Sequence, residues 1–111
     1  MVPRSWVRHL AHETDHEVWA TGNQALCEEA DVPGTSEALS RVDYEPVGVG
    51  LDRRQRVTLL SELFPEADRY VVVDVDLSHL DGWEHYFPWT FVERVRAGHL
   101  EIGVSDALLA E

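Results

Sequence analysis

The segment Arg69–Leu77 constrains the fold more than any other, because Tyr-Val-Val-Val runs directly into the carboxylates of Asp74 and Asp76. Its apolar part has no alternation of polar and apolar residues, so we expect a strand that is covered on both faces. Such strands are typical of parallel sheets flanked by helices, which place their chemistry at the carboxyl ends of the strands. Two aspartates there could bind a hard cation such as Mg²⁺ or transfer a proton, and they are the catalytic candidates. The alternative is a pair of solvated loop acids in a very acidic protein.

The composition limits the class of protein and its partners. A chain of 111 residues, 44% of them hydrophobic, fits a single domain, 1–111, with one core. The net charge of −12 argues against nucleic acid or anionic membrane as a partner, because nine dispersed arginines do not supply a basic surface. The acid excess predicts a halophile, whose salty cytoplasm would screen the repulsion among these charges. The chain has no membrane-length apolar run and no signal-peptide core, which predicts a cytoplasmic protein.

Helical and extended patterns alternate along the chain. The apolar spacing and the capping residues predict helices at 5–15, 24–30, 35–42, 53–64 and 89–97, with a short one after Ser105. Extended segments are predicted at 16–20, 47–51, 69–77 and 99–104, and a loop at 77–88, whose aromatic residues are expected to cover the sheet. This alternation predicts the α/β class, with a mainly parallel, Rossmann-like sheet flanked by helices.

Two segments are candidates for binding an anion. Thr21-Gly22-Asn23 is predicted to leave a strand and enter a helix, where a hydroxyl group, backbone N–H groups and the helix dipole favour phosphate. Arg53, Arg54 and Arg56 lie in the first turn of the 53–64 helix, where cations oppose the helix dipole. These arginines are either solvated among many acids or placed there to meet an anion.

Three histidines form a third candidate site. His9, His12 and His16 stand at positions i, i+3 and i+7 and would line one stripe if the first helix continued to His16. Three imidazoles so placed could hold a transition metal. If His16 instead begins a strand, its ring turns away and the three are ordinary surface residues.

The order of these segments resembles part of the haloacid dehalogenase superfamily of phosphatase-like hydrolases. In that family one strand ends in Thr or Ser, a later helix carries a basic residue, and a later strand ends in a metal-binding acid. The matching segments are Val18–Asn23, the 53–64 helix and Val71–Asp76. The resemblance implies that Thr21 binds phosphate, that Asp74 or Asp76 binds Mg²⁺, and that an arginine replaces the family's usual lysine. It implies a small phosphorylated substrate.

The family's nucleophilic Asp-x-Asp strand has no counterpart, because only Met1–Arg4 precede the opening helix. The resemblance therefore predicts a sheet that lacks its first strand. The gap is filled by a second copy of the chain or by a partner chain, or the two neighbouring strands pair directly with each other. It also predicts no turnover by the chain in this form. In a circularly permuted rival, Asp74 is the nucleophile and Asp76 the acid/base.

Three functions follow from these patterns. The first is an incomplete, Mg²⁺-dependent hydrolase domain, for which Thr21 and Asp74 should face one cleft at the carboxyl ends of two parallel strands. The second is an acidic, non-enzymatic interaction module that binds a partner strand at an open sheet edge. The third is a histidine-rich transition-metal binder.

Overall fold

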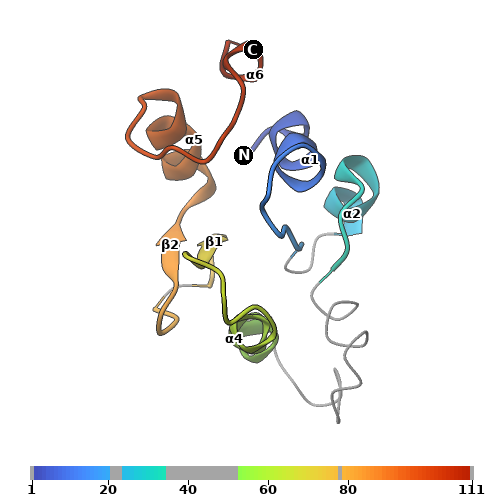
Figure 1. The fold of residues 1–111 in the computed structure, drawn as a ribbon, viewed down its shortest axis with the longest axis vertical. Helices are drawn as coiled ribbons and strands as arrows, with labels where there is room; N and C mark the ends of the chain where they lie inside the picture. The colour runs from blue at the N-terminus through green and yellow to red at the C-terminus, as the bar shows by residue number, and fades with distance from the viewer. Residues whose placement is uncertain (1, 21–23, 35–52, 78, 111) are drawn as a thin grey trace.

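The computed structural model describes residues 2–20, 24–34, 53–77 and 79–110, and the structural statements that follow concern these residues. Figure 1 shows two short strands lying between helix α4 and helix α5, with α1 and α2 side by side. The predicted elements at 35–42 and 47–51 lie outside the described residues. The elements in chain order are α1 (Arg4–His12), α2 (Gln24–Ala30), α4 (Arg53–Leu63), β1 (Val71–Val73), β2 (Glu84–Tyr86), α5 (Pro88–Arg96) and α6 (Asp106–Leu109).

Strands β1 and β2 form a parallel pair. Val71, Val72 and Val73 pair in register with Glu84, His85 and Tyr86. The ladder continues by one hydrogen bond at each end, from the Glu84 N–H to the Tyr70 carbonyl at 2.8 Å and from the Asp74 N–H to the Tyr86 carbonyl at 3.2 Å. The prediction of a loop throughout 77–88 is wrong at β2, whose polar sequence has no strand signal of its own. The described residues contain a two-stranded sheet, so the mainly parallel, Rossmann-like sheet stays a prediction.

The two faces of β1 are covered by different helices, as the Val-Val-Val run predicts. Side chains alternate across a strand. Val72 is buried in a cluster with Val57 of α4, whereas Val73 packs against a cluster that includes Trp6 of α1 and Phe91 of α5. Tyr86 of β2 packs on the same side as Val73.

Helix α4 runs antiparallel to β1. At its carboxyl end, the carbonyls of Ser61 and Phe64 accept hydrogen bonds from the hydroxyl of Tyr70, the residue before β1. At its amino end, the Arg54 guanidinium donates to the carbonyl of His79, in the loop that follows β1. The amino terminus of α4 therefore lies beside the carboxyl end of β1.

The extended segment at 16–20 is mostly irregular, and its one strand-like contact is a parallel bridge between Ala20 and Gly34. The Ala20 N–H donates to the Pro33 carbonyl at 2.9 Å. Ala20, Ala30 and Val32 form a small buried cluster against α1 and α2. The predicted strand before Thr21 is thus reduced to a single bridged residue within the described part of the chain.

The helix ends mark where the sequence predictions hold and where they do not. Helix α2 has the predicted bounds, and Gly98, with φ of 77°, follows α5 in the left-handed conformation expected of a residue that ends a helix. Helix α1 is shorter than predicted and is capped by Pro3 in place of Ser5. The strand predicted at 99–104 is wrong, since those residues form an irregular segment with Leu100 buried.

Candidate functional site

The carboxyl end of β1 is a rigid acidic turn centred on Asp74. The Asp74 N–H and carbonyl are both bonded to β2, the carbonyl accepting from His85 Nε2 at 2.7 Å. The Asp74 carboxylate turns back on its own loop, and its Oδ1 accepts from the N–H groups of Asp76 at 2.8 Å and Leu77 at 3.3 Å. Asp76 is exposed, and Leu77, 5% exposed, fixes the turn in the core under α4. The turn holds the half-buried Asp74 carboxylate in a defined orientation, two residues before the exposed Asp76.

The amino terminus of α4 brings a cation to the same loop. Arg54 is exposed, and its guanidinium donates to the carbonyl of His79, a residue held in the left-handed conformation with φ of 58°. Such a conformation is uncommon for a residue with a side chain. Arg56 is half-buried, and the side chain of Arg53 lies outside the described atoms. The Arg54 contact therefore joins α4 to the loop after Asp76.

The predicted phosphate turn cannot be placed with these groups, because Thr21, Gly22 and Asn23 lie outside the described residues. The ring of Trp19, two residues earlier, lies 6.1 Å from that of Phe64. Phe64 follows the carboxyl end of α4, whereas Asp74 lies near its amino end. The shared cleft of Thr21 and Asp74 stays a prediction, and the site described here consists of Asp74, Asp76 and Arg54.

A row of aromatic side chains follows Asp74's partner strand. The ring centroids of His85 and Phe87 lie 4.9 Å apart in an edge-to-face arrangement. The rings of Phe87 and Trp89 are stacked with centroids 4.9 Å apart and an interplanar angle of 1°. Trp89 is 58% exposed and Phe87 40%, so the expectation that the aromatic residues of the 77–88 loop cover the sheet is wrong for Phe87. The signal in the sequence is the spacing of two residues between each ring and the next.

The three histidines of the amino-terminal region point to three different backbone carbonyls. The Nε2 atoms of His9, His12 and His16 bond to the carbonyls of Gly103, Asp31 and Ile102. The prediction that the three rings line one stripe fails, because α1 ends at His12. Within the described ranges no group of three or more His, Cys, Asp or Glu side chains is placed to hold a metal ion.

His9 is bonded at both ring nitrogens. Its Nδ1 meets the Glu13 carboxylate while Nε2 meets the Gly103 carbonyl at 3.0 Å. Both partners are acceptors, so this pair of contacts favours the doubly protonated imidazolium form of the ring. The hydrogen bonds from Glu13 and then from the Gly103 carbonyl raise the pKa of His9 above its usual value.

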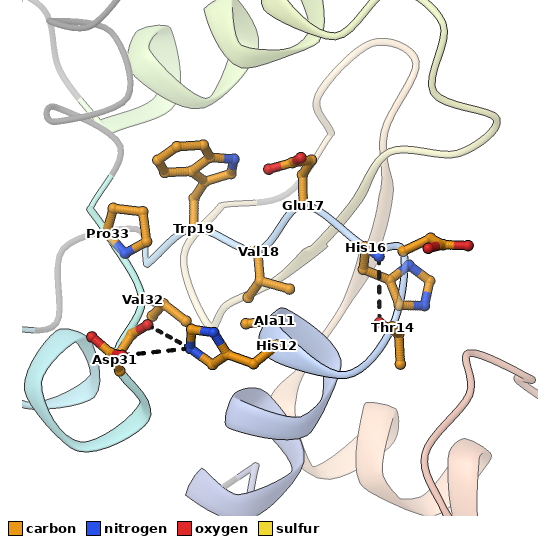
Figure 2. A pocket seen from close by; sticks show the side chains of 11 residues that line it. Ala11, His12, Thr14, His16, Glu17, Val18, Trp19, Asp31, Val32 and Pro33 are labelled. Atoms are coloured by element: carbon orange, nitrogen blue, oxygen red, sulfur yellow. Dashed lines mark hydrogen bonds and ion pairs between the residues drawn. The ribbon is translucent and has the colours of Figure 1, made fainter.

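A pocket of about 420 Å³ opens beside this region (Figure 2). In Figure 2, His12 and Asp31 lie on one side of the segment that carries Glu17 and Trp19, and dashed lines join His12 to Asp31. Three carboxylates line the pocket, those of Asp15, Glu17 and Asp31, and none of its described lining residues is an arginine. These negative charges disfavour a phosphate or another anion there.

The chain matches no protein-family model, and comparisons with curated proteins and with solved structures found no match either. In the described part of the chain, no helix has the length and apolar character that crossing a bilayer requires.

Proposed function

We propose that this chain forms the phosphate-binding and metal-binding part of a Mg²⁺-dependent, phosphatase-type hydrolase of the α/β class. One observation carries the proposal: α4 runs antiparallel to β1, so that Arg54 reaches the loop that follows Asp74 and Asp76. In sheets of this kind, ligands bind where strands end and helices begin. The resemblance to the haloacid dehalogenase superfamily supports the same assignment from the order of segments in the sequence.

The phosphoryl group of a small phosphorylated substrate binds at the amino terminus of α4. The N–H groups of the first turn and the helix dipole favour an anion there. Arg54 adds a full positive charge, and a guanidinium presents its N–H donors in a fork that matches two phosphate oxygens. A cation in the first turn opposes the helix dipole, and a bound anion between the two removes that conflict.

Asp74 and Asp76 hold the Mg²⁺ ion in this proposal. Carboxylate oxygens are the ligands that Mg²⁺ prefers, and the turn brings both acids to the same edge. Asp74 Oδ1 accepts two backbone N–H groups, and these bonds orient the carboxylate at the end of the strand. Mg²⁺, when bound, neutralises charge on the transferring phosphoryl group.

The nucleophile comes from a strand added to this sheet. Two strands are marginally stable without further pairing, and the described residues give β1 and β2 no third neighbour. A homo-oligomer or a partner chain can complete the sheet, and a partner chain can also bring the Asp-x-Asp carboxylates next to Asp74. Without it we expect no turnover of a generic phosphate ester, because groups that act as a unit lose nearly all activity when one is missing.

The same two-stranded sheet favours a second candidate function, an acidic interaction module. Each strand presents one edge that pairs with no further strand in the described part of the chain, and such edges bind extended peptides by main-chain hydrogen bonds. This candidate needs no metal and no phosphate, so ligand binding separates it from the hydrolase.

Calorimetric titration of the chain with Mg²⁺, and then with inorganic phosphate in saturating Mg²⁺, tests the proposal. Asp76→Asn should weaken Mg²⁺ binding by about tenfold or more, which corresponds to about 1.4 kcal/mol. Asp81→Asn is the matched control, since Asp81 is an exposed acid of the same loop. Arg54→Gln should weaken phosphate binding similarly, with the exposed Arg8→Gln as its control.

Equal loss of Mg²⁺ affinity in Asp76→Asn and Asp81→Asn would mean that the ion follows the overall negative charge, and the metal site would be wrong. Turnover by the unmodified chain that Asp74→Asn abolishes would make Asp74 the nucleophile, as in the permuted rival.

A further inference from the structure

We propose that Phe87 and Trp89 form a stacking surface for an aromatic ring of the substrate, which makes the substrate class an aromatic phosphate monoester. The inference rests on the proposed function, since it names the substrate of the same site. It starts from two exposed rings whose position relative to Asp74 follows from the register of the sheet.

Phe87 is the neighbour of Asp74 across the ladder. Val73 pairs with Tyr86, and the Asp74 N–H donates to the Tyr86 carbonyl, so the next residue on each strand is Asp74 on one and Phe87 on the other. Adjacent strands lie about 4.8 Å apart. A ligand held by the Asp74 turn is therefore within reach of the Phe87 ring.

The acid, the arginine and the first ring belong to the same face of the sheet. Asp74 follows Val72 by two residues, and Phe87 follows His85 by two, so each pair shares a face. Val72 and His85 are register partners, and Val72 is buried against Val57 of α4. This is the face of the sheet that α4 covers. Arg54 lies one turn before Val57, at the amino end of α4.

The stacking surface is preformed. His85, whose Nε2 bonds to the Asp74 carbonyl, meets Phe87 edge to face, and Phe87 stacks on Trp89 with the rings parallel to within 1°. Pro88 between them opens α5 and has a restricted backbone. The row is thus fixed at one end to the residue proposed to bind the metal.

Exposing these apolar rings to water is unfavourable in free energy, and a ligand that covers them would offset that. Val75, Phe87 and Trp89 are the large apolar side chains that the described residues leave exposed, and the last two are neighbours in one stack. Stacking on an aromatic ring is the interaction that planar bases and aryl groups use with proteins. A flat ring beside a phosphate site selects an ester that carries a ring next to its phosphate.

Two pairs of probes, titrated calorimetrically in saturating Mg²⁺, test the inference. Phenyl phosphate is compared with methyl phosphate, and adenosine 5′-monophosphate with ribose 5-phosphate, so that each pair differs by a ring. We expect the ring to tighten binding by about tenfold in at least one pair, which tells an aryl ester from a nucleotide. In the double variant Phe87→Ala/Trp89→Ala that ratio should fall to about one, with the ring-free probe unchanged.

Val75→Ala is the matched control, because Val75 is 54% exposed and lies outside the stack. It should leave both ratios unchanged. If ring-free phosphates bind through Arg54 but the ring adds nothing in either pair, the stacking surface is wrong while the phosphate site stands. If no phosphate binds, the proposed function and this inference both fail.

Discussion

The histidine-rich end of α1 and the acidic end of β1 both gather titratable side chains, but they use them differently. His9, His12 and His16 bond to carbonyls of residues far away in the sequence, with separations of 94, 19 and 86 residues. Asp74 Oδ1 accepts hydrogen bonds within its own turn, from the N–H groups of Asp76 and Leu77, two and three residues later. Side chains that connect distant segments hold the fold together, whereas a carboxylate bonded within its own turn is oriented at the surface.

The largest expected effect separates the two regions by their tryptophans. Trp6 is fully buried, donates from Nε1 to the Leu108 carbonyl and joins α1 to the α5 cluster, so Trp6→Ala should lower the free energy of unfolding by about 3–5 kcal/mol. Trp89→Ala should change it by less than about 0.5 kcal/mol, as surface substitutions do. Urea unfolding measures both. Comparable losses would show that the Trp89 stack is part of the core.

A smaller effect distinguishes the two aspartates of the acidic turn. Asp74→Ala removes the acceptor of two backbone N–H groups and should destabilise the protein by about 1 kcal/mol. Asp76→Ala should destabilise the protein less, since Asp76 is an exposed residue. Urea midpoints of the two variants decide this. If Asp76→Ala were the more destabilising of the two, then Asp76, and not Asp74, would be the residue that stabilises the turn.

The imidazolium of His9 predicts a loss of stability as the pH rises. A raised folded pKa means that the stabilising contribution is complete below the unfolded pKa of about 6.5 and disappears as the pH passes the folded value. His9→Gln should therefore flatten the dependence of the melting temperature on pH above neutrality. A wild-type curve that rises over this range would contradict the assignment of a charged ring.

The smallest effect concerns the Arg69–Glu84 pair beside the sheet and has the opposite sign in pH. The Arg69 guanidinium lowers the pKa of Glu84, so its contribution is present above the ordinary glutamate pKa and is lost as the pH falls. Both side chains are well exposed, so solvent screening keeps the contribution of the pair small. Glu84→Gln, melted in acid and at neutral pH, should differ from wild type only at neutral pH. A difference that grows in acid would refute the ion pair.

The sequence predicts β1, α2 and α5 well because their signals are local. Val71–Val73 are apolar without alternation, and burial on both faces follows from that pattern alone. Gly98 ends α5 because a left-handed residue is required there. Asp74, Asp76 and Arg54 are likewise candidates from their positions at the ends of predicted elements.

What the sequence does not predict depends on contacts between distant residues. Glu84–Tyr86 becomes a strand because β1 offers it a partner, a context that propensity does not contain. The 99–104 segment has a strand-like composition, yet its carbonyls are taken by His9 and His16. The bond from His85 to the Asp74 carbonyl likewise depends on the pairing of β1 with β2, which the sequence does not indicate.

The bond between Trp6 and Leu108 has a consequence for how the protein folds during synthesis. The two residues are 102 positions apart, so α1 leaves the ribosome long before the segment that completes its core. At about 5–20 residues per second, the delay is roughly 5–20 s. For that time the indole of Trp6 lacks its final cover, which exposes the nascent chain to chaperones and to aggregation at this helix.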